Sequence, residues 1–164
     1  MKERMIEASC PFCGHTFYIK RDTLVISSMN PVIVSRLKNR TYFSHLCSKC
    51  HHLFYLTYPF MLKNTEKKYC LIVSDRENFE DLVDQGRVVV VKSVNAFYQA
   101  FAILEANLSF PVVLKKQKQL EARVQQSVLF ESYDSKNQCL WFEVGSQLLA
   151  VLLSDEEVEK IQLD

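Results

Sequence analysis

Four cysteines in the first third of the chain stand in two C-x-x-C pairs, Cys10 with Cys13 and Cys47 with Cys50. A C-x-x-C turn brings two thiolates to one side of a metal ion, and two such turns complete the four-sulfur tetrahedron that structural zinc prefers. Paired spacing of this kind is a strong signal for metal binding. The sequence therefore predicts one structural Zn²⁺ ion held by Cys10, Cys13, Cys47 and Cys50.

The residues beside these pairs fit tight metal-binding turns. Pro11 stiffens the first turn, and Gly14 can take the positive φ angle that often follows such a loop. His51 and His52 follow the second pair, where a histidine can replace a cysteine as ligand, donate a hydrogen bond to a thiolate or stand free on the surface. For these two histidines we expect the surface position.

Two other kinds of cysteine chemistry match one pair each. The sequence CPFC from Cys10 to Cys13 resembles a glutaredoxin redox motif, in which a helix N-terminus activates the first thiolate. The residues after it are typical of a strand, and that chemistry does not need the second pair. The sequence CSKCH from Cys47 to His51 matches a haem-attachment motif, which requires an export signal. A thiol redox protein or sensor using Cys10 and Cys13 remains an alternative.

The elements that must position the cysteines indicate an α+β fold. Asn30-Pro31 is typical of a helix start, and the four valines 88–91 predict a strand buried on both faces. From residue 93 apolar residues recur every three or four positions, which predicts an amphipathic helix. The predicted strands are 15–26 (one or two strands), 41–46, 52–58, 68–74, 87–92, 129–133, 138–144 and 148–153, and the predicted helices are 31–38, 76–84, 93–108, 111–126 and a short one capped by Ser154.

These elements suggest two parts. Residues 1–126 form the first, with a four-cysteine zinc ribbon over about 7–60, a helical insertion between its two arms and a mixed α/β body. Residues 127–164 form a β-hairpin or small antiparallel sheet followed by a short helix, packed on the same body. Cys70 and Cys139 are expected to be core residues. The aromatic segment 54–61 is either core or a contact patch, and we favour core.

The motifs together resemble the CpXC-domain proteins of bacteria and archaea over residues 7–126. The resemblance rests on CPFC at Cys10, on Asn30-Pro31, on CSKC at Cys47 leading to Tyr58-Pro59, and on the segment 88–108. It implies a zinc ribbon joined to an α+β body, in a family without an assigned activity.

Charge is distributed unevenly along the chain. The net charge is +1, but residues 1–70 hold eleven basic and four acidic residues, and the remainder is acidic. A basic ribbon with aromatic side chains can bind nucleic acid. An ordinary charged surface is the interpretation we favour. The candidate nucleic-acid contacts are Lys20, Arg21, Arg36, Lys38, Arg40 and Lys49, with Tyr18, Tyr42 and Phe43 for stacking.

Signals for catalysis are weak, although an enzyme is not excluded. A four-thiolate zinc ion has no open position for water or substrate, and no phosphate-binding glycine loop or nucleophile elbow is present. One acidic cluster is more typical of a solvated helix face than of an active site. Its members are Asp75, Glu77, Glu80, Asp81 and Asp84.

The expected role is therefore that of a non-enzymatic zinc protein acting through protein contacts, as an adaptor for an unidentified partner. The start of the chain lacks the apolar segment of a signal peptide, and no stretch is long and apolar enough for a membrane span. Together with cysteines suited to a reducing compartment, this predicts a cytoplasmic location. The basic and acidic halves also suit head-to-tail oligomerisation.

Overall fold

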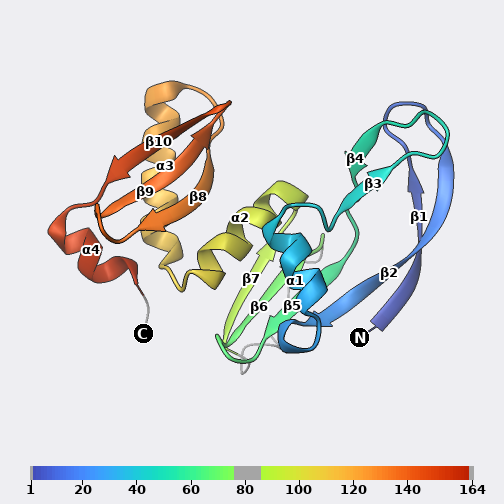
Figure 1. The fold of residues 1–164 in the computed structure, drawn as a ribbon, viewed down its shortest axis with the longest axis horizontal. Helices are drawn as coiled ribbons and strands as arrows, with labels where there is room; N and C mark the ends of the chain where they lie inside the picture. Colours follow the sequence, from blue (N-terminus) through green and yellow to red (C-terminus); the bar gives the residue numbers. More distant parts are fainter. Residues whose placement is uncertain (1, 76–85, 163–164) are drawn as a thin grey trace. The chain divides into compact units, whose positions relative to one another are not determined.

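The structure is a computed structural model that describes residues 2–75 and 86–162. Its described residues form four α-helices and three β-sheets, in agreement with the predicted α+β class (Figure 1). No described helix combines the length and the hydropathy of a bilayer-spanning segment. The helix predicted at 76–84 lies outside the described residues, as do all members of the acidic cluster except Asp75.

The chain divides into two compact units, Met1–Tyr98 and Gln99–Asp164. The division falls within helix α2 (Val94–Glu105), whose first residues belong to one unit and whose remainder belongs to the other. The sequence predicts a division after residue 126, on the basis of where the family resemblance ends. That division stays a prediction.

A five-stranded sheet is the main element of the first unit. In spatial order its strands are β1 (Lys2–Ser9), β2 (Thr16–Ile26), β5 (Phe60–Asn64), β6 (Tyr69–Val73) and β7 (Arg87–Val91). β1 and β2 form an antiparallel hairpin, β2 joins β5 in parallel through its last three residues only, and β6 pairs antiparallel with β5 and parallel with β7. Most of the hairpin therefore extends beyond the rest of the sheet and carries the first cysteine pair at its tip.

A second, shorter hairpin carries the other cysteine pair. Strands β3 (Ser44–Leu46) and β4 (Leu53–Tyr55) pair antiparallel, and their last paired residues are Leu46 and Leu53. Cys47 to His52 form the connection between them. Each cysteine pair therefore lies at the closed end of a β-hairpin.

Helix α1 (Pro31–Lys38) lies between the two hairpins in the sequence and has the predicted bounds. Its start is set by Pro31 rather than by an Asn30 side-chain cap, because the Asn30 amide donates instead to the Ile26 carbonyl at 3.0 Å. At its other end the Arg36 guanidinium donates to the Thr41 carbonyl at 3.1 Å. A short 3-10 turn, Ser27–Met29, connects β2 to α1.

The prediction that the valine-rich strand is buried on both faces is wrong. Every residue of β7 is half-buried, whereas all five residues of its neighbour β6 are buried. Both strands are hydrophobic, so composition does not explain the difference in burial. Their positions in the sheet do. Among the described residues β6 pairs on both sides, and β7 pairs on one side only.

An aromatic cluster forms the core of the first unit. Phe43 packs against Tyr58, Phe60 and Phe97 at ring-centroid distances of 5.5, 5.4 and 5.3 Å. The Phe43 amide donates to the Tyr98 hydroxyl at 3.1 Å, which fixes the chain just before β3. Tyr58 and Phe60 belong to the segment 54–61, so its predicted core role is confirmed at these positions.

The second unit packs helices against one face of an antiparallel sheet. Helix α3 (Phe110–Val124), strands β8 (Leu129–Asp134), β9 (Cys139–Val144) and β10 (Gln147–Leu152), and helix α4 (Asp155–Ile161) follow one another along the chain. The strands form an antiparallel meander in the order β10-β9-β8, in agreement with the small antiparallel sheet predicted for residues 127–164. Its core contains Val113, Leu120, Phe130, Phe142 and Ile161.

Candidate metal centre

The first cysteine pair lies in a tight turn closed by two backbone hydrogen bonds. The Cys10 amide donates to the His15 carbonyl at 2.8 Å, and the Gly14 amide donates to the Cys10 carbonyl at 2.9 Å. Gly14 has φ of 74°, as predicted for this position. The Phe12 amide points inward and donates to the Cys10 sulfur at 3.4 Å.

The second pair repeats this turn with a different residue at the strained position. The Cys47 amide donates to the His52 carbonyl at 3.0 Å, and the His51 amide donates to the Cys47 carbonyl at 2.9 Å. His51 corresponds to Gly14 and has φ of 63°. The same hydrogen-bonding pattern therefore forms twice, once with glycine and once with histidine at the left-handed residue.

The two turns bring the four sulfurs into one cluster. Cys10 Sγ lies 3.6 Å from Cys50 Sγ, and Cys13 Sγ lies 3.7 Å from Cys47 Sγ. All four sulfurs are within 4.8 Å of one another. Four sulfurs at about 2.3 Å from a tetrahedral ion are separated by roughly 3.8 Å, and a disulfide requires about 2.05 Å. The cluster therefore fits one shared metal ion and contains no disulfide.

The cluster is buried from one side only. Cys10 and Cys47 are 2% and 0% exposed, Cys50 is half-buried and Cys13 is exposed. An ion bound here would contact the two hairpins through its buried ligands and lie close to solvent beside Cys13.

Backbone amides, burial and neighbouring sulfurs separate the pKa values of Cys47 and Cys50. Backbone amides of Cys50 and Lys49 donate to the Cys47 sulfur, and they lower the pKa of Cys47 to about 6 against the effect of burial. At Cys50 the largest effect is the His52 amide, which lowers the pKa, but burial and the neighbouring sulfurs together raise it to about 12. A bound divalent cation would lower the pKa of all four thiols, because it stabilises the thiolate form of each ligand.

His51 and His52 are both exposed, as expected, but His52 also contacts the cluster. Its Nδ1 lies 3.3 Å from the Cys50 sulfur, and its ring stacks on Phe12 with centroids 4.4 Å apart and planes 16° apart. These contacts tie the tip of one hairpin to the other. His51 shows no comparable contact with a sulfur among the described residues.

A second aromatic stack joins the hairpins below the cysteines. His45 of β3 stacks on Phe17 of β2 at 4.5 Å, and both rings contact Phe54 of β4. Burial lowers the pKa of His45, which favours the neutral ring. This stack was missed because a histidine in a strand carries no signal of its partner. The one available indication was that His15 and Phe17, two residues apart on a predicted strand, both carry rings on the same face.

The predicted nucleic-acid residues are distributed over several elements. Lys20 and Arg21 occupy adjacent positions of β2 and so point to opposite faces of the strand. The Arg36 guanidinium lies 5.6 Å from the centre of the Tyr42 ring and is held at the end of α1. Lys38 is the last residue of α1, Arg40 follows that helix, and Lys49 lies in the second cysteine turn.

The proposed stacking role of Tyr42 and Phe43 is wrong. Their side chains are 4% and 1% exposed because both pack into the aromatic core of the first unit. Tyr18 is 65% exposed, so it alone of the three predicted aromatic residues is accessible to a base.

The glutaredoxin-like arrangement of the redox alternative is not found at Cys10, and a redox role for Cys10 and Cys13 stays untested. In a reactive C-x-x-C motif a helix N-terminus stabilises the first thiolate. Here Cys10 follows β1, and the chain after Cys13 enters β2. Cys70 and Cys139 are buried, as predicted for core residues, and burial raises the pKa of both thiols.

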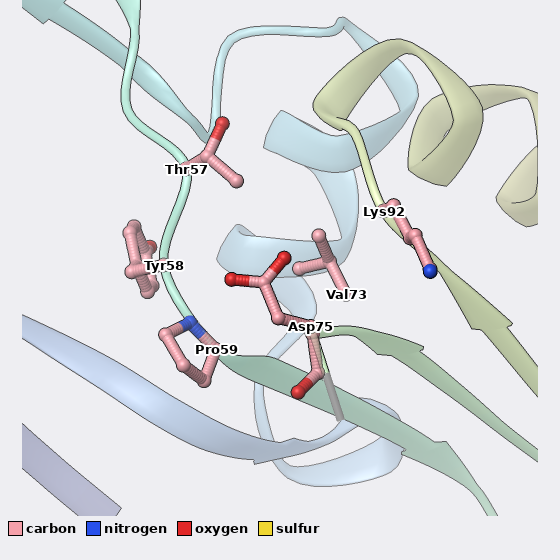
Figure 2. A pocket seen from close by; sticks show the side chains of 7 residues that line it. Thr57, Tyr58, Pro59, Val73, Asp75 and Lys92 are labelled. Carbon is pink, nitrogen blue, oxygen red and sulfur yellow. The ribbon is translucent and has the colours of Figure 1, made fainter. Parts of the chain in front are cut away.

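A small pocket of about 70 Å³ lies elsewhere in the first unit, between the segment before β5 and the ends of β6 and β7. Figure 2 shows the Asp75 carboxylate directed between Thr57 and Val73, with Lys92 on the neighbouring chain segment. The volume is enough for about two water molecules and is well below that of a typical small-molecule site. The pocket does not contact the cysteine cluster.

Comparison with known proteins connects the cluster to a family. No curated protein and no solved structure matches the chain. A family model described as CpXC protein matches residues 8–163, which extends beyond residue 126, where the sequence resemblance ended. The match includes both cysteine pairs and nearly the whole second unit, and the chain therefore belongs to the CpXC protein family.

Proposed function

We propose that Cys10, Cys13, Cys47 and Cys50 bind one Zn²⁺ ion, which holds the two hairpins together as a zinc ribbon with α1 inserted between its arms. Two distances between sulfurs of different hairpins carry this proposal: 3.6 Å from Cys10 to Cys50 and 3.7 Å from Cys13 to Cys47. Both are close to the sulfur–sulfur distance in a tetrahedral zinc–thiolate site. Four soft thiolates favour zinc or iron over magnesium or calcium. The His52 contact with Cys50 supports zinc binding from outside the ligand set.

The ion is proposed to be structural and the protein to act as an adaptor through contacts with another protein. With four protein ligands the ion has no open position to activate water. Free thiols suit a reducing compartment, which supports a cytoplasmic location.

Metal content tests the zinc proposal. Protein purified without chelators is expected to contain one zinc ion per chain, with four sulfur neighbours at about 2.3 Å in X-ray absorption spectra. Cys13→Ser and Cys47→Ser should lose the metal, and Cys139→Ala, which changes a buried cysteine outside the cluster, should keep it. Protein that contains iron or no metal, or a Cys47→Ser variant that keeps full zinc occupancy, would contradict the proposal.

Nucleic-acid binding is a second candidate because of one surface feature. Tyr18 and Lys20 are both exposed and stand two residues apart on β2, so they share one face of the strand. Retention on single-stranded RNA or DNA should then weaken steeply with salt and fall in a Tyr18→Ala, Lys20→Glu variant. Absence of retention at low salt would reject this function.

A further inference from the structure

The outer edge of β10 is an unpaired strand edge in the second unit (Figure 1). β10 pairs with β9 from Gln147↔Val144 to Leu152↔Cys139, and no described residue pairs with its other side. In an antiparallel pair joined by a two-residue turn, alternate residues direct their backbone groups toward the partner strand. The bond from the Leu153 amide to the Gln138 carbonyl fixes that alternation. The backbone groups of Leu148, Ala150 and Leu152 therefore point outward.

This edge lacks the features that usually prevent strand addition. Edge strands are commonly protected by charged residues, proline or a bulge. β1, an edge strand of the first unit, carries charged residues along its length, whereas β10 has the sequence QLLAVL and no irregularity in its register. Leu148 and Leu152 are 52% and 72% exposed. An apolar and exposed edge of this kind favours pairing with another extended segment.

A groove runs along the same edge. Its volume is about 680 Å³, and it is lined on one side by the consecutive residues Ala150, Val151 and Leu152. Successive side chains of a strand point to opposite faces, so a hollow that contacts three in a row follows the backbone edge itself. The remaining lining residues, among them Leu120, come from α3.

Two basic residues of α3, Lys116 and Arg123, line the groove, and no acidic residue of the described chain does. Helix α3 contains four basic residues and one acidic residue. The acidic residue, Glu121, faces the protein through contacts with Gln117 and the Val128 amide. Lys116 is paired with Glu157 at 2.8 Å, whereas no described acidic residue forms an ion pair with Arg123. A ligand side chain near Arg123 therefore gains most from a negative charge.

We propose that β10 binds an extended acidic segment of a partner protein, which adds a strand to the sheet and directs acidic side chains toward α3. The outward groups of Leu148, Ala150 and Leu152 would hydrogen-bond the segment's backbone, and its alternate apolar side chains would lie beside Leu148 and Leu152. The segment's other side chains enter the groove beside Arg123. This assignment rests on the proposed adaptor role and gives that role a surface and a class of partner.

The test uses the full-length, zinc-loaded chain labelled with ¹⁵N and a synthetic peptide of alternating valine and glutamate. Binding should slow amide exchange at Leu148, Ala150 and Leu152, whose amides are directed to solvent in the free protein, much more than at Leu149 and Val151. A peptide of alternating valine and lysine is the matched control and should bind at least about tenfold more weakly at low salt.

Variants locate the site. Ala150→Pro removes an outward amide, and Leu152→Lys places a charge on the edge, so each should weaken acidic-peptide binding about tenfold or more. Arg123→Glu should weaken it severalfold. Lys136→Glu makes the same charge change in the exposed turn between β8 and β9 and should leave binding unchanged. Leu152→Lys keeps the test decisive if the proline variant does not fold.

Several outcomes would overturn the inference. These are failure of the acidic peptide to bind, equal binding of both peptides, binding insensitive to Ala150→Pro and Leu152→Lys, and a dimer that Leu152→Lys dissociates, which would assign the edge to a second copy of the chain. Zinc content is measured on the same samples, so the metal site is judged separately. A purified protein partner that binds wild type and edge variants equally would leave the adaptor role intact and remove β10 from it.

Discussion

His51 occupies a backbone conformation that ordinarily favours glycine. Its φ of 63° allows its amide to reach the Cys47 carbonyl, as the Gly14 amide reaches the Cys10 carbonyl in the other turn. Gly14 was predictable because glycine is the usual residue at positive φ. The left-handed conformation of His51 was not predictable from its side chain. The available indication was its position directly after the second cysteine pair, which is equivalent to that of Gly14 after the first.

Substitutions at His51 should follow this backbone requirement. We expect His51→Val to destabilise the zinc-loaded protein by about 1–2 kcal/mol, because a β-branched side chain is strained at positive φ. His51→Gly should leave stability unchanged or raise it slightly. Thermal unfolding of the two variants checks the order, and a valine variant as stable as the glycine variant would contradict it.

His52 should influence metal affinity without being a ligand. Removing its contact with the Cys50 sulfur and its stacking on Phe12 should weaken zinc binding roughly tenfold, with one ion still bound per chain. Competition against a colorimetric chelator measures the change in His52→Ala. His15→Ala, which makes no described contact with a sulfur, serves as the control. An unchanged affinity in His52→Ala would show that the contact has no effect on the site.

At the scale of elements, the sequence predicted most helices and strands but missed two strands that complete the main sheet. Half of the residues of β1 are charged, which is more typical of a solvated terminus than of a strand. β5 alternates buried and half-buried residues, but it follows an aromatic run that hid this alternation. In both cases pairing with β2 provides the stabilisation that local propensity does not indicate.

Helix α4 shows an element whose start could be read directly. Ser154 accepts a hydrogen bond from the Glu157 amide at 3.2 Å, and the Glu157 carboxylate accepts one from the Ser154 amide at 2.9 Å. The same carboxylate pairs with Lys116 of α3. The Lys116 ammonium and the Ser154 amide lower the pKa of Glu157 to about 2.

The pH dependence of stability should reveal this carboxylate. Because its pKa is lower in the folded state than the ordinary value of 4.5, ionised Glu157 stabilises the fold fully above pH 4.5. That contribution is lost as the pH falls toward about 2. Glu157→Gln should therefore lower stability at neutral pH by about 1 kcal/mol and reduce the loss of stability on acidification.

Denaturant unfolding at several pH values provides the measurement for this change. Glu159→Gln alters an exposed residue of the same helix and is the control. Equal acid sensitivity of wild type and Glu157→Gln would contradict the assignment.

At the scale of the whole molecule, the family match spans both units, whereas the cysteine cluster belongs to the first alone. The cluster was predictable from spacing, because two C-x-x-C pairs are typical of one four-sulfur metal site. The free edge of β10 was not, since the sequence QLLAVL is equally suited to an interior strand. Whether a strand is paired depends on its neighbours in space, which its own residues do not specify.

Removal of the metal should therefore act unevenly along the chain. We expect chelation to increase hydrogen exchange first in β3, β4 and the two cysteine turns, with β9 protected for longer. Hydrogen-exchange mass spectrometry follows both regions, and fluorescence of Trp141, the single tryptophan, reports on β9 independently. Simultaneous loss of protection in both units would contradict this prediction.

The distance in sequence between the two cysteine pairs has a consequence for how the protein is made. Thirty-three residues separate Cys13 from Cys47, so a shared ion is a reversible cross-link that closes a long loop containing α1. During translation Cys10 and Cys13 emerge before the second pair, and until Cys47 has left the ribosome the nascent chain offers a cation only two of the four sulfurs. Supply of the ion then matters most in that interval, when the exposed thiols are open to oxidation and to competing metals.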